Sequence, residues 1–289
     1  MRLLAFGGWG QLGTDLAVAA SGRHELVRPR HSEVDVTNET AVVDVVTRVD
    51  ADAVINMAAF HKVELCEDDP ATAFGVNAVG AVKVARAARR AGARYVFIST
   101  DYVFGGDQTG GWRESDAVGP LNVYGASKSA GEMGVMAVAP DALIVRGSGM
   151  FGHAGSAGKG GNFVDNIIAR ARSGEKLSVV DDQIFAPTST KDMAERLLTL
   201  LEQSVPPGVY HASNSGSCSW YTLARTALRI VGVDADLTPR ATGESPVRRP
   251  RYSVLLDTKS AALGLPRSRS WEEALEWYLS APAAGGQPL

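Results

Sequence analysis

The stretch Tyr124-Gly125-Ala126-Ser127-Lys128 follows Ser99-Thr100-Asp101 in the chain and lies well downstream of Gly7-Gly8-Trp9-Gly10-Gln11-Leu12-Gly13. On a helix, residues four apart share a face, so we expect the Lys128 ammonium to lie beside the Tyr124 ring. An unperturbed phenol titrates near pH ~10, and lowering its pKa to about 7 takes about 4 kcal/mol. A cation in a partly dry cleft can supply much of this. Together the three segments predict one redox site.

The order of the segments matters more than any one of them. With 31 Gly in 289 residues, a glycine-spaced string is a weak signal by itself. The alternative for the glycines is a ligand-free turn, and the alternative for Tyr124 and Lys128 is a packed ring with a solvated amine. Their succession in one chain favours the enzyme interpretation.

Composition restricts the class of protein. The chain has 45% hydrophobic and 21% charged residues and a net charge of -3, so we expect small-molecule partners and neither nucleic acid nor a membrane surface. Cys66 and Cys218 are far apart with no metal-type spacing, which predicts two reduced thiols and no metal site. Met1-Arg2 leads directly into an apolar run and no 18-residue apolar stretch follows, which predicts a cytoplasmic protein.

Short apolar runs alternate with longer amphipathic stretches through the first half, which is the rhythm of βαβ units. We expect strands at Leu3–Phe6, Glu25–Val27, Ala53–Asn56, Tyr95–Ser99 and Ala142–Arg146. From Ala71 to Ala91 apolar residues recur at helical spacing, which predicts a helix. The predicted fold class is α/β, a Rossmann-type doubly wound parallel sheet with a smaller α/β substrate-binding lobe built mainly from the C-terminal half.

The chain changes character after Arg146, because residues 147–161 hold seven glycines and predict a long loop. Beyond it we expect helices at Asn162–Ser173, Asp192–Gln203, Ser219–Val231 and Ser270–Leu279, strands at Leu177–Val180 and Val209–His211, and a Pro- and Arg-rich link at Pro239–Arg251. We assign residues 1–147 to a dinucleotide-binding domain to which about 184–215 return, 148–183 and 216–280 mainly to the substrate lobe, and 281–289 to a flexible tail.

Gly7, Gly10 and Gly13 follow a strand and precede a helix, the context that a dinucleotide-binding turn requires. The first glycine permits a tight turn, the second lets the backbone approach a pyrophosphate, and the third lets helix and strand pack closely. Gln11 and Leu12 complete the turn. We therefore expect the phosphates at the start of the first helix.

Arg28, with Arg30 nearby, ends the second strand in place of the acidic residue that binds a free ribose 2′-hydroxyl. This favours NADPH; a solvated arginine is the alternative, which leaves NADH open. Further cofactor contacts are expected from residues that follow neighbouring turns and strands. They are Asp35 and Val36 at the adenine edge, and Ala58 and Ala59 where the cofactor crosses the strand ends.

Thr100 ends a strand, at the edge where open parallel sheets place their ligands. Thr100 can hydrogen-bond a substrate carbonyl, Tyr124 can protonate the developing alkoxide, and Lys128 can hold both the phenol and the nicotinamide ribose. A positioned proton donor contributes about 10²- to 10⁴-fold, and the cofactor provides the hydride.

Several longer runs extend this pattern along nearly the whole chain. They are Gly10–Gly13, Asp35–Thr37, Ser99–Phe104, Asn122–Gly125 with Ser127-Lys128 and Gly131-Glu132, Gly161–Val164, Asp182-Gln183, Pro187-Thr188 and Arg249-Pro250. By these runs the chain resembles the dTDP-4-dehydrorhamnose reductase family of extended short-chain dehydrogenases/reductases.

The resemblance implies reduction of the C4 ketone of a dTDP-linked keto-deoxysugar to dTDP-L-rhamnose or a close relative, for polysaccharide or glycoside biosynthesis. It implies Tyr124 as general acid, Thr100 as carbonyl anchor and Lys128 as electrostatic support. It also implies two groups of substrate contacts, which are Val63, Asp101 and Tyr102 at the sugar, and Asn162, Phe163 and Arg249 near the nucleotide diphosphate. Guanidinium groups pair well with phosphate oxygens, and a solvated loop arginine is the alternative for Arg249. A homodimer is compatible with the resemblance.

Two positions depart from the family. Gly149 stands where many members carry a Trp, so an aromatic platform for the sugar is either missing or supplied from elsewhere. Phe185 stands where a glycine is common, which predicts core filling, with a reshaped cleft as the alternative.

Related activities fit less well. A dehydratase would carry Asp-Glu directly after the threonine, whereas here Tyr102 follows Asp101. An epimerase would hold NAD and have an acidic residue at the position of Arg28. An NADP-binding regulatory subunit, like the β subunit of methionine adenosyltransferase, shares the fold and stays open as an alternative.

Overall fold

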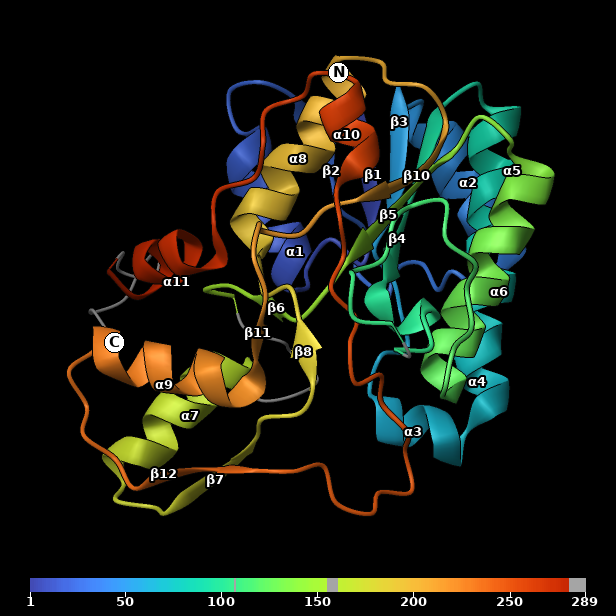
Figure 1. Cartoon of the computed structure of the whole chain (residues 1–289). Coiled ribbons are helices and arrows are strands. Elements are labelled where there is room, and N and C mark those ends of the chain that lie inside the picture. Colours follow the sequence, from blue (N-terminus) through green and yellow to red (C-terminus); the bar gives the residue numbers. More distant parts are fainter. Residues whose placement is uncertain (107, 155–160, 281–289) are drawn as a thin grey trace.

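The centre of the protein, in a computed structural model that describes residues 1–106, 108–154 and 161–280, is a six-stranded parallel sheet of order β10-β5-β4-β3-β1-β2 (Figure 1). Its strands are β1 (Arg2–Phe6), β2 (Glu25–Val27), β3 (Ala53–Asn56), β4 (Arg94–Thr100), β5 (Leu143–Gly147) and β10 (Gly208–His211). The chain passes from β2 at one edge to β3 on the far side of β1, which creates a switch point for ligand binding. Every predicted strand of this sheet is confirmed.

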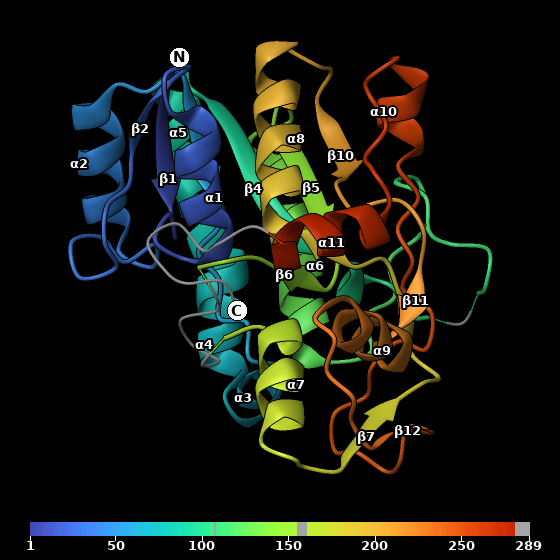
Figure 2. The same cartoon turned by 90° about the vertical axis from the view of Figure 1, so that its left-hand side faces the viewer.

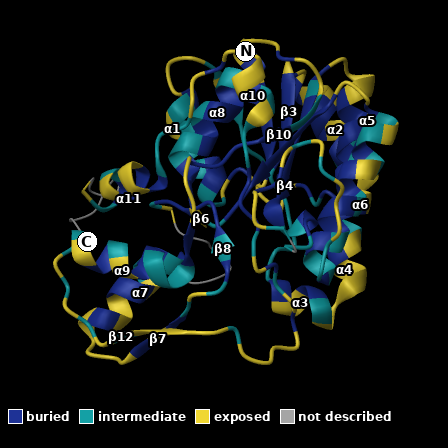
Figure 3. Ribbon diagram, in the orientation of Figure 1, coloured by how far each residue is buried: buried dark blue, intermediate teal, exposed yellow. Residues whose placement is uncertain are grey.

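Helices cover both faces of the sheet. On one face α1 (Gln11–Ala20) and α8 (Thr190–Glu202) pack beside each other and lie in front of the strands in Figure 2. On the other face lie α2 (Glu39–Val49), α5 (Ala81–Arg90) and α6 (Val123–Val138). The strands are therefore buried on both sides, as Figure 3 shows, and the doubly wound α/β prediction is confirmed.

The helix expected at Ala71–Ala91 is present but interrupted. After α3 (Val63–Asp68), the chain forms α4 (Pro70–Phe74), a π-helical turn η1 (Gly75–Gly80) and then α5. The wide turn directs the Asn77 amide inward, where it bonds the backbone of Phe60 in both directions and donates to Ser127 at 2.9 Å. This ties the π-turn to α6, the helix that carries Tyr124 and Lys128.

A separate apolar cluster lies in the later part of the chain. It is built from α7 (Phe163–Arg172), α9 (Trp220–Ile230), α11 (Trp271–Ser280) and β7 (Leu177–Val180), which pairs with β12 (Leu237–Arg240). The four predicted helices beyond residue 161 are confirmed to within two residues at each end. The strand β12, at the start of the predicted link, was not anticipated, and neither was α10 (Thr258–Ala262). The division of the chain into two domains stays a prediction.

The loop prediction for residues 147–161 was wrong at one point. Met150 and Phe151 form a short strand, β6, which pairs with β9 (Thr188–Ser189) almost 40 residues away. A second short pair joins β8 (Ile184–Phe185) to β11 (Cys218–Ser219). Residues 155–160 and the predicted tail, 281–289, lie outside the described residues.

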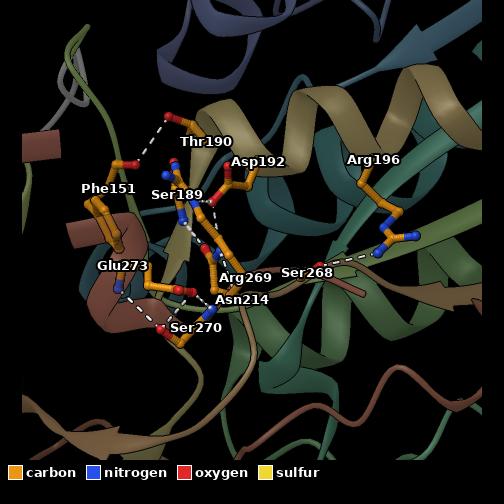
Figure 4. A network of polar contacts seen from close by, with 10 residues as sticks. All are labelled: Phe151, Ser189, Thr190, Asp192, Arg196, Asn214, Ser268, Arg269, Ser270 and Glu273. Atoms are coloured by element: carbon orange, nitrogen blue, oxygen red, sulfur yellow. Dashed lines mark hydrogen bonds and ion pairs between the residues drawn. The ribbon is translucent and has the colours of Figure 1, made fainter. Parts of the chain in front are cut away.

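A polar network joins α8, the segment after β10 and the start of α11 (Figure 4). The Asp192 carboxylate accepts hydrogen bonds from Asn214 at 2.6 Å and from Arg269 at 2.8 Å. Asn214 accepts in turn from the Ser189 backbone at 2.7 Å. The C-terminal helix is thereby anchored against the sheet. Among the described residues, no helix combines the length and the apolar character that crossing a bilayer would take.

Candidate active site

One cleft of about 1090 Å³ runs along the carboxyl ends of the strands and continues between the sheet and the later part of the chain. All but one of the predicted site residues line it. They are Gly7, Gly10, Gln11, Leu12, Gly13, Asp35, Val36, Ala58, Ala59, Val63, Thr100, Asp101, Tyr102, Tyr124, Lys128, Asn162, Phe163 and Arg249. Arg28 is the exception. Within the described ranges, no three His, Cys, Asp or Glu side chains gather as a metal site would require.

The glycine turn has no room for side chains. Gly7 has φ +71, and a Cβ there would lie 2.6 Å from the Ala58 nitrogen, while one on Gly13 would overlap the Gly8 backbone. Gly10 caps α1 without a side-chain hydrogen bond, so the first N–H groups of the helix stay unpaired by its cap. The Gln11 amide nitrogen is buried with no partner in the described part of the chain. These donors fit the pyrophosphate of a dinucleotide.

The Arg28 side chain lies beside this turn. Its guanidinium donates to the Gly8 carbonyl at 3.1 Å and lies 4.2 Å from the Trp9 ring centroid. The Arg30 guanidinium lies at the same distance from that ring, and the Trp9 indole donates to the Arg28 carbonyl at 2.9 Å. Trp9 lines the cleft, so both arginines contact a residue of the cleft wall. No local pattern had singled out Trp9.

Asp35 and Val36 lie at the cleft wall beyond β2. One carboxylate oxygen of Asp35 accepts from the Thr37 backbone and hydroxyl, both at 2.8 Å, and the backbone bond in particular lowers the pKa of Asp35. No hydrogen bond from the described residues reaches the second carboxylate oxygen. Val36 is buried, and Ala58 and Ala59 follow β3 after one intervening residue. The cleft wall formed by these four residues therefore combines a hydrogen-bond acceptor, the Asp35 carboxylate, with apolar side chains.

Asp101, directly after β4, is a carboxyl group held by hydroxyls. It is 3% exposed and accepts from Thr100 at 3.0 Å, from Ser148 at 2.7 Å and from Ser253 at 2.6 Å. Burial raises the pKa of Asp101, and the three hydroxyl bonds oppose that rise. The two serines come from distant loops, and local sequence gives no sign of either contact.

Thr100 has a single hydroxyl proton and two lone pairs. With Asp101 ionised, the proton is directed at that carboxylate, and one lone pair accepts from the Tyr102 backbone at 3.2 Å. Tyr124 also forms a side-chain hydrogen bond with Thr100. Thr100 thus aligns the Tyr124 hydroxyl.

The predicted fall in the Tyr124 pKa was wrong. Burial raises the pKa of Tyr124 above its ordinary value, the Asp101 charge adds to the rise, and only the Thr100 bond opposes it. The Lys128 ammonium is 2% exposed and lies 3.9 Å from the centroid of the Phe97 ring. Burial lowers the pKa of Lys128 to about 7, and Glu132 one turn later opposes that fall. The desolvation of Tyr124 therefore outweighs the attraction between the Lys128 cation and a Tyr124 phenolate.

The helix α6 begins in a way that places both residues. The Asn122 side chain accepts from the Gly125 backbone at 2.8 Å and so fixes the first turn, where Tyr124 lies. Behind Lys128, Glu132 forms a two-pronged ion pair with Arg146 of β5, at 2.8 and 2.6 Å. The carboxylate one helical turn after Lys128 is therefore already paired with Arg146.

The predicted substrate residues differ in their surroundings. Val63 begins α3, and the Tyr102 ring lies edge-on to Tyr124 at 6.0 Å. Arg249 is paired with Glu64 and interacts with Tyr102, whose pKa burial raises to about 12. Asn162 is occupied as the cap of α7, since its side-chain oxygen accepts from the Asp165 backbone at 3.0 Å. Its amide nitrogen donates to Gly152, Asp165 and Tyr278.

Phe163 packs against Trp220, an unpredicted residue of the cleft. Phe185 is buried in the C-terminal cluster, which confirms the prediction of core filling, and its ring also borders the cleft.

The chain matches the family model described as RmlD substrate binding domain over residues 1–283. It is 38% identical to the spore coat polysaccharide biosynthesis protein SpsK of Bacillus subtilis, over 96% of each chain. It is 37% identical to a dTDP-4-dehydrorhamnose reductase of Mycolicibacterium smegmatis, over 95% of this chain and 84% of the relative. The solved dTDP-4-dehydrorhamnose reductase of Bacillus anthracis in complex with NADP superposes with a TM-score of 0.91 at 35% identity, over 96% of this chain and 98% of that one.

Proposed function

The chain belongs to the dTDP-4-dehydrorhamnose reductase family, and from that premise we propose that it reduces the C4 ketone of a dTDP-linked 4-dehydro-6-deoxysugar with NADPH. One observation carries the proposal. Thr100, Tyr124 and Lys128 border the same cleft as the glycine turn of Gly7 to Gly13, so a cofactor on the turn and a ketone beside the phenol can meet.

Bound NADPH would supply the hydride to the ketone carbon. Tyr124 supplies the proton to the ketone oxygen, and its raised pKa keeps that proton on the phenol at neutral pH. Lys128, in its charged form, stabilises the phenolate that remains. We assign to Thr100 the alignment of the phenol, because its own proton is directed at Asp101. Asp101 then acts on the substrate through Thr100.

The substrate's diphosphate fits Arg249, which lies in the cleft near Tyr102. Glu64 is its present partner, so phosphate must compete with a carboxylate for the guanidinium. Val63 and Tyr102 are assigned to the sugar side. Phe163 is assigned to the nucleotide side, where Asn162 acts by holding the start of α7.

The test is NADPH oxidation at 340 nm with a panel of dTDP-4-keto-6-deoxysugars. We expect Tyr124→Phe to lower kcat at least ~100-fold and to leave NADPH affinity nearly unchanged, because only the proton donor is deleted. Tyr210→Phe is the matched control, since its hydroxyl bonds the Pro206 carbonyl away from the cleft. Near-normal turnover of the Tyr124 variant would defeat the assignment.

NADPH bound without turnover of any panel member, combined with tight binding to a second protein, would favour a regulatory subunit.

Cofactor choice has its own test. Arg28 and Arg30 both stack on Trp9 at the cleft rim, where their charges can meet a ribose 2′-phosphate. We expect Arg28→Ala to weaken NADPH about tenfold and NADH much less. Equal losses for the two cofactors, measured by fluorescence titration, would contradict a phosphate contact.

A further inference from the structure

Gly149 and Phe185 are sterically complementary. Gly149 has φ +42, and a Cβ on it would overlap the Phe185 ring. Gly149 follows β5 by two residues, and Gly147 at the end of β5 is the register partner of Thr100. Between them, Ser148 bonds Asp101. The Phe185 ring therefore fills the space over Gly149 at the end of the cleft where the proposed chemistry occurs.

Phe185 supports a larger aromatic group. Its ring stacks on Trp220, with centroids 4.0 Å apart and planes at 26°, and Phe163 meets Trp220 edge-on at 4.7 Å. Phe185 is only 3% exposed, whereas Trp220 and Phe163 are partly exposed, and all three border the cleft. The accessible surface of this cluster therefore comes mainly from Trp220 and Phe163.

The backbone fixes Trp220 in this position. It is the first residue of α9, which Ser219 caps by accepting from Thr222 at 3.0 Å. Cys218 and Ser219 pair with Phe185 and Ile184 in the β11–β8 ladder, so Trp220, directly after β11, lies beside the strand that carries the phenyl ring. A side chain held by a cap, a ladder and two ring contacts is preorganised for binding.

We propose that Trp220, supported by Phe185 and Phe163, is the platform for the sugar ring of the substrate and thereby determines specificity; this rests on the proposed function. A 6-deoxyhexose presents a C–H face and a C6 methyl group that make no hydrogen bonds. Burying them against an aromatic ring is favourable, whereas the reacting carbonyl is left to Tyr124. The position of Phe185 beside Gly149 and Ser148 assigns the platform to the sugar and not to the base.

Equilibrium binding tests this directly. Calorimetric titrations with dTDP-L-rhamnose and with dTDP, both in the presence of NADP⁺, separate the sugar from the nucleotide. We expect Trp220→Ala to weaken dTDP-L-rhamnose about tenfold or more and dTDP less than about twofold. Trp220→Phe, which keeps a ring, should lose much less. Trp277→Ala is the matched control, because Trp277 packs against the same apolar cluster but does not border the cleft.

The alternatives give different results. Equal weakening of both ligands would place the base on Trp220 and overturn the proposal, as would unchanged affinity for both. A wild-type protein that bound neither ligand would overturn the proposed function together with the platform.

The supporting contact has a separate test. Gly149→Ala should displace the Phe185 ring and weaken dTDP-L-rhamnose selectively, and adding Phe185→Leu should recover part of the loss. An unchanged affinity in Gly149→Ala, in a protein with normal NADP⁺ binding, would remove Phe185 from the platform.

Discussion

Two buried carboxyl groups flank the proposed reactive residues, and their surroundings differ. Glu132 on α6 is 6% exposed and is neutralised by the two-pronged Arg146 pair. Asp101 after β4 is also buried, and in the described part of the chain its side-chain hydrogen bonds come from three hydroxyls and from no cation. The first arrangement compensates a buried carboxylate with a guanidinium, whereas in the second, burial raises the pKa of the carboxyl group. The same residue class is therefore paired with a cation on one side of the site and held by hydroxyls on the other.

The largest expected effect breaks the ion pair. Arg146→Met leaves the Glu132 charge buried without its partner, so we expect the free energy of unfolding to fall by about 3 to 5 kcal/mol. Denaturant titration measures this. Adding Glu132→Gln should recover much of the loss, since no charge then remains. Arg170→Met, which removes an exposed ion pair with Glu175, should leave the midpoint unchanged. A small loss in Arg146→Met would contradict the difference between the two carboxyls.

The second prediction concerns Asp101. A carboxyl group with a raised folded-state pKa contributes stability below its unfolded pKa of about 4, and this contribution is lost as pH rises toward the folded value. Asp101→Asn does not ionise, so its stability relative to wild type should increase from about pH 4 to pH 7, by at most about 1.4 kcal/mol per pH unit. Unfolding titrations across this range measure the trend.

Asp182 provides the control of opposite sign. The Thr242 hydroxyl lowers the pKa of Asp182, so its contribution is present above the unfolded pKa and is lost as pH falls. Asp182→Asn should therefore lose relative stability as pH rises through about 4. Parallel trends for the two variants would show that Asp101 is not distinguished by its hydroxyl surroundings.

The smallest effect tests the α6 side again. The Phe97 ring lies under the Lys128 ammonium and favours its charged form, as Glu132 does. Phe97→Leu should lower the Lys128 pKa below about 7 by up to about one unit. The alkaline fall in NADPH oxidation should then begin at lower pH, whereas Phe97→Tyr should leave it in place. An unshifted profile in the leucine variant would exclude a contribution from the ring.

Local patterns predicted the strands of the sheet, the turn from Gly7 to Gly13 and the placement of Thr100, Tyr124 and Lys128 in one cleft. Each depends on neighbours in sequence: alternation of apolar runs, glycine spacing, and a four-residue helical step. The π-turn at Gly75–Gly80 and the strand β6 were missed, because Asn77 and Met150 find their partners far along the chain.

The order of amino acids was enough to predict which chemical groups the protein has and which of them share a strand end or a helix face, because these follow from the fixed periods of local backbone structure. The pKa shifts of these groups and their hydrogen-bond partners became evident only from the folded structure. Burial set the direction of the Tyr124 and Lys128 pKa shifts, and two distant serines came to Asp101. Trp220 likewise lies at the cleft because of a ladder whose paired residues, such as Cys218 and Phe185, are far apart in the sequence. Desolvation and long-range packing depend on all the atoms around a group, and no local pattern contains them.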